Sequence, residues 1–367
     1  MLDSEAGLAL AAHSLMPAAL RPPYHWHRRM TRQGYAAAVL LVAAVLPVVG
    51  VYVYLEKDAY RPLAEGAAAS AWTDSSHFEY PVADGDACGP ASHRGEDVLK
   101  WAAALGARVH PHLAVASVDL PSGGDGERGL VASKAILDGT VLVVCPRALH
   151  MSVTFLRNSS ALRDVYDFLD QNDIVHSSLF GLAFLLLHEA RNTSSFWRPY
   201  LCALPRHPAS AFLMPPAQRD RLRRQLPPDQ WWRFDREVQR QLSRSGALHH
   251  ALKNYLGRFP ARFRLEDYSL LRIKWALAIL ASRAFSTFDA SLRVPVHTLV
   301  PCIDLPNHDA AGRPVRETSK GDMELLAHTS LEPGSAVLTS YGVTCAAVFL
   351  AHYGFAPAAS RDAPCTD

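Results

Sequence analysis

The sequence predicts an α+β fold of small twisted β-sheets with an α-helical insertion, preceded by a transmembrane helix. Strand-like patterning on both sides of a helical middle part, residues 151–280, predicts the mixed fold. An uncharged apolar stretch at residues 35–55 predicts the membrane helix. With 367 residues, the chain is long enough for a large core and for two domains.

The overall composition indicates a globular protein. Hydrophobic residues make up 49% of the chain and charged residues 20%, which is not the composition of a disordered chain. The formal net charge is only +2, so the protein as a whole has no strong basic field. We therefore expect no nucleic-acid partner.

Residues 1–34 form a basic tail in front of the apolar stretch. A helix over residues 35–55 would span about 30 Å, the thickness of the hydrocarbon core of a bilayer. Arg28, Arg29 and Arg32 precede this stretch, so the positive-inside rule predicts a single-pass membrane protein in the type II orientation. The alternatives are a buried core helix, a cleaved signal peptide and an organelle-import leader.

Residues 56–95 are predicted to form a flexible stem, because their Ala-rich and Ser/Asp/Gly-rich pieces lack a sustained period. Ordered structure is expected to begin at residue 96. There Val98, Trp101 and Leu105 share one face of a predicted helix. The ordered chain then divides into a strand-rich part, a helical insertion, a second strand-rich part and a tail, at residues 96–150, 151–280, 281–357 and 358–367.

Two short motifs suggest cofactors that their surroundings exclude. Gly124, Gly126 and Gly129 satisfy the dinucleotide-binding pattern G-x-G-x-x-G, but strand-like segments follow where a helix should begin. The pair His188-Glu189 lacks the second histidine of a zinc-protease motif. We therefore expect neither a dinucleotide site nor a metal site.

The six cysteines are widely spread along the chain. None of them forms a Cys-x-x-Cys pair, so the spacing indicates neither a zinc cluster nor a dense disulfide framework. Buried free thiols are the expected state of the six cysteines, which are Cys88, Cys145, Cys202, Cys302, Cys345 and Cys365.

Five motifs follow one another along residues 96–357. They are Arg128-Gly129-Leu130, Ser195-Phe196-Trp197-Arg198-Pro199-Tyr200, Ser282-Arg283-Ala284-Phe285, Asp304 with Asn307-His308, and Ser340-Tyr341-Gly342 with Tyr353-Gly354-Phe355. In this order the set resembles a SET domain, in the branch of the RuBisCO large-subunit lysine methyltransferase-like proteins. The resemblance implies methyl transfer from S-adenosylmethionine to an amine side chain. It also implies a pseudoknot-like C-terminal part and a helical insertion.

The resemblance implies roles for individual residues. The residues that would bind the methyl donor are Glu127, Arg128, Gly129, Arg283, Asn307, His308 and Phe355. Those that would bind the substrate are Arg283, Asp304, Tyr341 and Tyr353, with Tyr341 as the catalytic residue.

The chemistry of these residue types agrees with the implied roles. An Asn-His pair beside aromatic rings can bind a purine by hydrogen bonding and stacking. The guanidinium of Arg283 can clamp a carboxylate, although an ordinary arginine at a helix end is the alternative. An aromatic channel would desolvate a lysine and lower its pKa from about 10.4, so no dedicated base is required.

The sequence thus predicts a membrane-anchored, S-adenosylmethionine-dependent N-methyltransferase whose partner is a lysine-bearing protein substrate. One alternative is methylation of histidine, which relatives in this branch use. The other is a SET-like binding or scaffold protein without turnover. Two departures favour the scaffold: Cys345-Ala346 replace the Asn usual in the family, and its long C-terminal helical domain has no counterpart after Phe355.

Overall fold

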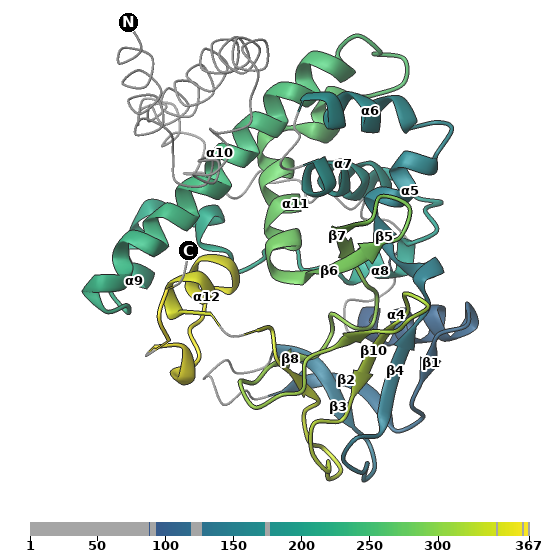
Figure 1. Cartoon of the computed structure of the whole chain (residues 1–367), viewed down its shortest axis with the longest axis vertical. Coiled ribbons are helices and arrows are strands. Elements are labelled where there is room, and N and C mark those ends of the chain that lie inside the picture. The colour runs from purple at the N-terminus through teal and green to yellow at the C-terminus, as the bar shows by residue number, and fades with distance from the viewer. Residues whose placement is uncertain are drawn as a thin grey trace, which may run out of the picture. The chain divides into compact units, whose positions relative to one another are not determined.

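The computed structural model describes residues 88, 93–118, 127–172, 177–342, 344–361 and 363–365. All of them belong to the second of two compact units, Ala69–Asp367. The predicted N-terminal tail and membrane helix, and most of the predicted stem, lie outside the described residues. Figure 1 follows the described elements along the chain.

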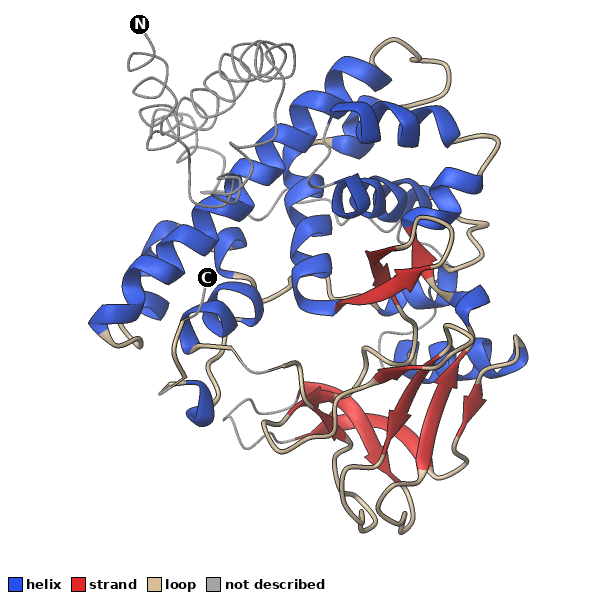
Figure 2. Ribbon diagram, in the orientation of Figure 1, coloured by secondary structure: helices blue, strands red, loops and turns tan. Residues whose placement is uncertain are grey.

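Small β-sheets and a group of helices make up the unit, as the sequence predicts (Figure 2). One antiparallel sheet has the strand order β1–β4–β10–β9, which are Arg108–Val109, Val141–Cys145, Met323–Leu326 and Arg316–Glu317. A second antiparallel sheet pairs β2 with β3, Leu113–Val118 with Glu127–Ala132. A third has the order β5–β7–β6, which are Met151–Ser152, Val294–Leu299 and Ala284–Asp289.

The middle of the chain is helical. Its helices α5 to α11 are Val153–Asn158, Arg163–Asn172, Ser177–Arg191, Arg198–Ala203, Pro216–Arg223, Trp231–Leu256 and Leu270–Arg283. Helix α7 packs against α5, α6 and α11, which explains why its sequence is apolar on every side. Helix α11 contributes Trp275, a fully buried ring whose Nε1 donates to the carbonyl of Pro205 at 3.1 Å.

Near the C-terminus, a parallel pair of short strands joins two distant segments. Strand β8, Asn307–His308, pairs with β11, Leu338–Thr339, so that Asn307 lies opposite Leu338 and His308 opposite Thr339. Strands β9 and β10 lie between these segments in the sequence. The pairing therefore brings the Asn-His motif next to the residues that precede Tyr341.

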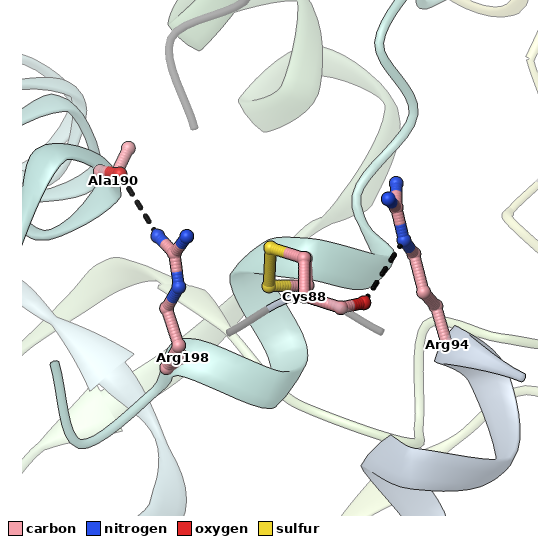
Figure 3. The surroundings of a disulfide bond; sticks show 5 residues. Cys88, Arg94, Ala190 and Arg198 are labelled. Carbon is pink, nitrogen blue, oxygen red and sulfur yellow. Dashed lines mark hydrogen bonds between the residues drawn. A yellow bond between two sulfur atoms is a disulfide. The ribbon is translucent and has the colours of Figure 1, made fainter. Parts of the chain in front are cut away.

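A disulfide bond joins Cys88 to Cys202, which corrects the expectation of free thiols there. It ties the segment before α4, Arg94–Ala104, to helix α8, and α4 also packs on α8. Figure 3 shows Arg94 donating from Nε to the Cys88 carbonyl at 3.2 Å. The two cysteines are 114 residues apart, so their spacing in the sequence gives no sign of the bond.

A second disulfide bond, Cys345–Cys365, corrects the same expectation near the C-terminus. It joins the residue before α12, Ala346–Tyr353, to the tail of the chain. The prediction is confirmed for Cys145 and Cys302, which are free and buried.

The predicted membrane localisation is also corrected. Among the described residues, no helix combines the length and the apolar character needed to cross a bilayer. The apolar stretch at residues 35–55, on which the prediction depended, lies outside the described residues. Membrane attachment therefore forms no part of the function proposed below.

Candidate active site

Strand β8 presents the Asn-His pair beside Tyr341. The backbone N–H of Tyr341 donates to His308 Nδ1 at 3.1 Å, which makes this nitrogen an acceptor. Burial lowers the pKa of His308, so its imidazole is neutral at pH 7. A neutral ring that accepts at Nδ1 carries its proton on Nε2.

The Tyr341 side chain is held by a hydrogen bond of its own. Its hydroxyl donates to the carbonyl of Pro306 at 2.9 Å, one residue before the Asn-His pair. A phenolic oxygen that donates its proton in this way keeps its lone pairs for accepting. The Tyr341 ring lies 5.2 Å from the His308 ring and 5.1 Å from the Tyr353 ring, measured between centroids.

Helix α12 and the turn after it supply the remaining rings of an aromatic cluster. Phe355 lies 6.3 Å from His308 and 6.0 Å from Tyr353. Burial raises the pKa of Tyr353 to about 12, so its hydroxyl stays protonated. Phe349, whose ring lies 4.9 Å from His308, had no predicted role. Its position four residues before Tyr353, on the same helical face, is the signal that could have found it.

Gly354 makes this arrangement of rings sterically feasible. It ends α12 in the left-handed conformation with φ +77°, which turns the chain between Tyr353 and Phe355. A Cβ atom at Gly354 would lie 2.3 Å from the carbonyl oxygen of Ala209. Both the backbone conformation and the space therefore require glycine.

Arg283, Asp304 and Tyr200 form a second cluster, at the end of α11. Arg283 Nη1 donates to the Asp304 carbonyl at 2.8 Å and to Asp304 Oδ2 at 3.2 Å. The Tyr200 hydroxyl donates to the same Oδ2 at 2.9 Å. Burial alone would lower the pKa of Arg283, but the nearby Asp304 carboxylate outweighs it and raises this pKa.

The other carboxylate oxygen of Asp304 has no such donors. The Asp304 side chain is 2% exposed, and no described residue donates a hydrogen bond to Oδ1. A buried acceptor of this kind is suited to a donor group on a ligand. Tyr200 had no predicted role, although its motif was recognised, because only the fold brings it to Asp304.

In strand β3, Gly129 has no side chain to block the approach of Asn307. A Cβ atom at Gly129 would lie 2.7 Å from Asn307 Nδ2, so glycine lets the amide approach the strand closely. Asn307 Nδ2 donates to the Arg128 carbonyl at 3.5 Å. The Arg128 side chain instead donates to the Ala203 carbonyl in α8 at 2.6 Å. The side chain of Glu127 lies outside the described residues, so only the strand backbone is known there.

Replacing Gly129 by alanine is expected to displace Asn307 and so weaken binding at the Asn-His pair. We expect the affinity for S-adenosylmethionine to fall about tenfold, because an added Cβ forces the amide to move. Isothermal titration calorimetry measures this affinity. Gly246→Ala is the matched control, since a Cβ there meets nothing within 4 Å. Equal affinity of both variants would contradict the proposed contact.

Helix α10 is tied to α12 by a contact between side chains. His352 Nε2 in α12 donates a hydrogen bond to Glu237 Oε1 in α10 at 2.6 Å. Arg240 also donates to Glu237. Burial raises the pKa of Glu237, but the hydrogen bonds and charges of His352 and Arg240 outweigh this and lower it to about 2.

Acid is therefore expected to weaken the attachment of α12. The folded-state pKa of Glu237 is lowered from 4.5 to about 2, so its stabilisation is present above pH 4.5 and is lost as the pH falls toward 2. We expect Glu237→Gln to lower the free energy of unfolding at pH 7 by about 1–3 kcal/mol, and by less at pH 3. Urea unfolding at both pH values tests this, with exposed Glu332→Gln as control. If the difference in unfolding free energy between wild type and Glu237→Gln were as large at pH 3 as at pH 7, the stabilising role of the Glu237 carboxylate would be contradicted.

A cavity of about 370 Å³ lies along the sheet β5–β7–β6. Thr287, one of its lining residues, is four residues beyond Arg283, about 13 Å along an extended strand. Exposed rings of Phe155 and Phe196 also line it, and the full set adds Arg147, Ala148, His150, Ser152, Thr154, Asn158, Trp197, Val296 and Thr298. None of the predicted site residues lines this cavity.

Comparisons with known proteins identify the fold. The SET domain of LSMT bound to lysine and AdoHcy superimposes with a TM-score of 0.57 and 20% identity, over 72% of this chain and 58% of that one. Rubisco LSMT bound to sinefungin and monomethyllysine gives 0.55 and 20%, over 72% and 56%. No family model matches the chain.

Curated sequences show the same relationship. The actin-histidine N-methyltransferase of Papio anubis is 25% identical over 284 residues, 71% of this chain and 42% of the relative. The N-lysine methyltransferase setd6 of Xenopus laevis is 22% identical over 283 residues, 70% of this chain and 56% of the relative. The chain thus spans about half the length of the relatives it matches. The resemblance to SET-domain proteins of the LSMT-like branch is confirmed.

Proposed function

We propose that this SET-domain protein is an S-adenosylmethionine-dependent protein N-methyltransferase that acts on lysine. The observation that carries the proposal is the set of contacts that His308 makes with Tyr341 and with the aromatic cluster. His308 Nδ1 accepts the N–H of Tyr341, and the imidazole ring lies within the aromatic cluster. A hydrogen bond therefore joins the Asn-His pair, which would bind the methyl donor, to Tyr341, which would orient the substrate.

The residues of the site fit the methyl donor. The Asn307 amide offers hydrogen bonds to a purine, and His308, Phe349 and Phe355 offer ring faces beside it. Gly129 keeps the neighbouring strand open to a close approach. When bound, the donor supplies an electrophilic methyl group on a sulfonium centre.

Tyr341 is the residue that we propose to orient the nucleophile. Because its hydroxyl donates to Pro306, its oxygen can accept from the N–H of a neutral amine or from the polarised methyl group. Tyr353 and Phe355 would wall the channel and exclude water, which keeps the amine in line with the methyl group. Asp304 Oδ1, buried and without a donor among the described residues, would accept from the amine.

The amine must be neutral before transfer. Desolvation by the aromatic cluster lowers the pKa of a lysine from about 10.4, and its proton leaves to solvent before the methyl transfer. No described residue needs to act as a dedicated base. Arg283 and Tyr200 hold Asp304 in place, so they would position the acceptor and not take part in proton transfer.

Histidine is a second candidate target. The curated relatives include an enzyme named for histidine methylation and one named for lysine methylation. A histidine would be neutral near pH 7 without any desolvation. Mass spectrometry of the methylated product assigns the residue, and methyl-histidine without methyl-lysine would replace lysine in the proposal.

Titration calorimetry with S-adenosylmethionine on the full chain tests the proposal against the scaffold alternative. In the turn after Ser340-Tyr341-Gly342, where the family usually has Asn, this chain has Cys345, which forms a disulfide bond. This departure favours the scaffold alternative. We expect one donor per chain and labelled product when a proteome extract is added. An absence of donor binding would end the enzyme proposal, and binding without labelled product would favour the scaffold.

A further inference from the structure

One surface cavity has no part in the proposed methyl transfer. It is the cavity of about 370 Å³ along the sheet β5–β7–β6, and it is also lined by residues of α5, which packs on β5 and β7 (Figure 1). Its volume is at the lower end of the range of about 300–1,000 Å³ that is usual for small-molecule sites. The cavity can therefore take a small ligand but not a folded partner.

Two half-exposed aromatic rings line this cavity. Phe155 is 45% exposed and Phe196 is 47% exposed. Both rings make T-shaped contacts with the buried ring of Trp197, with centroids 4.9 and 5.4 Å apart. Trp197 is held in turn, because its Nε1 donates to the Leu149 carbonyl at 2.9 Å. Rings that are fixed in this way and still open to solvent offer an apolar surface to a ligand.

The polar groups that line the cavity are mostly uncharged. His150 Nε2 donates to the Cys145 carbonyl at 3.3 Å, and burial lowers the pKa of His150 to about 4, so the neutral ring keeps Nδ1 as an acceptor. No described residue forms a hydrogen bond with the Ser152 hydroxyl or with the Asn158 side-chain amide. Only Arg147 among the lining residues carries a formal charge at pH 7. This chemistry suits a neutral ligand that is rich in hydroxyl and amide groups.

One lining residue, Asn158, is also an acceptor for N-linked glycosylation by its sequence. Asn158-Ser159-Ser160 satisfies the pattern Asn-x-Ser/Thr. Asn158 is the last residue of α5, and both it and Ser160 are exposed. Phe155 lies three residues earlier on the same helix, so the two side chains are neighbours on its surface. A sugar attached to Asn158 Nδ2 would therefore begin beside the exposed rings of the cavity.

The two disulfide bonds indicate the kind of compartment in which this modification takes place. Cys88–Cys202 and Cys345–Cys365 join residues that are 114 and 20 positions apart. Disulfides form and persist in oxidising environments, above all in secreted proteins and those that mature with them. Proteins of this class are also the ones in which the pattern Asn-x-Ser/Thr is an acceptor. The disulfides thus support glycosylation independently of the acceptor sequence.

We propose that Asn158 carries an N-linked glycan whose first sugars lie in the cavity, against Phe155 and Phe196. In the attachment step, Asn158 Nδ2 forms a bond to C1 of the first sugar of a lipid-pyrophosphate-linked oligosaccharide, which the cell supplies together with the transferase. The bond between C1 and the pyrophosphate oxygen breaks, the lipid pyrophosphate leaves with the electron pair, and the amide loses one proton to solvent.

The apolar face of a sugar would then cover the two rings, and its hydroxyl groups would reach His150 Nδ1 and the Ser152 hydroxyl. About one or two sugar rings fit a cavity of this volume. The inference does not depend on the proposed methyltransferase function, because none of the predicted site residues lines the cavity.

Peptide mapping by mass spectrometry tests the attachment on the full chain produced in a eukaryotic cell line. Digestion with N-glycosidase in heavy-oxygen water converts each glycosylated asparagine to a labelled aspartate, which assigns the occupied residues. We expect the label at Asn158 in the wild type and in Ser159→Ala, which keeps the acceptor pattern, and no label in Ser160→Ala, which removes it. An unlabelled Asn158 in the wild type, or a label that survives Ser160→Ala, would overturn the proposal.

Thermal unfolding of the same proteins tests whether the sugars lie in the cavity. We expect the Tm of Ser160→Ala to be about 2–4 °C below that of Ser159→Ala, because the contacts between the sugars and the rings are lost. When Phe155→Ala or Phe196→Ala is added to both variants, the difference should shrink, because one of the covered rings is gone. Equal Tm values of Ser160→Ala and Ser159→Ala, or a difference that both ring substitutions leave unchanged, would overturn the placement of the glycan in the cavity.

Discussion

Replacing Tyr341 by phenylalanine is expected to lower the turnover number about 100-fold or more, with little change in donor affinity. The hydroxyl donates to Pro306 and offers its oxygen to the amine and the transferring methyl group, so its loss acts in the transition state. The ring would stay between His308 and Tyr353. Single-turnover transfer of a labelled methyl group measures the rate, and calorimetry measures donor affinity.

Tyr166→Phe is the control for this result. Tyr166 lies buried in α6, away from the aromatic cluster, and the substitution also removes one phenolic hydroxyl. We expect it to keep the wild-type rate. Full activity of Tyr341→Phe, or an equal loss in both variants, would show that the hydroxyl of Tyr341 has no special role.

Replacing Asn307 by alanine is expected to weaken S-adenosylmethionine binding by about 1–3 kcal/mol, because buried polar partners are left unpaired. His308→Ala should have a similar or larger effect, since it also removes the acceptor of the Tyr341 N–H and a ring of the cluster. In both variants we expect the loss to appear in the dissociation constant of the donor, which calorimetry measures directly.

Asn172→Ala serves as the matched control for the amide. Asn172 is exposed at the end of α6 and donates to the Phe168 carbonyl at 2.7 Å. Its replacement should leave donor affinity unchanged. Wild-type affinity in Asn307→Ala and His308→Ala would mean that the donor binds elsewhere in the protein.

The sequence was sufficient to predict the mixed fold class, because this depends on local patterns, whereas the predicted site residues stay a proposal. Alternating strand-rich and helical parts predict the α+β fold. Asn307, His308 and Tyr341 belong to motifs whose order along the chain is distinctive. Contacts between distant segments were not predictable in this way, since Phe349 and Tyr200 gain their roles only when folding brings them to His308 and Asp304.

The errors have the same physical origin. The cysteine spacing could not reveal the two disulfides, because their partners meet only in the folded chain. A chain-wide charge of +2 likewise conceals the excess of Arg and Lys in residues 206–264, because a sum over residues carries no information about position. The motif around Arg128 likewise gives no sign that its side chain donates to the Ala203 carbonyl of α8, while its own carbonyl accepts from Asn307.

Transfer of a labelled methyl group from S-adenosylmethionine to proteins of a cell extract tests the central claim most directly. The full chain is incubated with the labelled donor, and the products are digested and assigned by mass spectrometry. We predict methyl-lysine on at least one protein with wild type and a loss of that signal with Tyr341→Phe. Absence of any labelled protein with the wild-type chain, despite measured donor binding, would contradict the assignment as a methyltransferase.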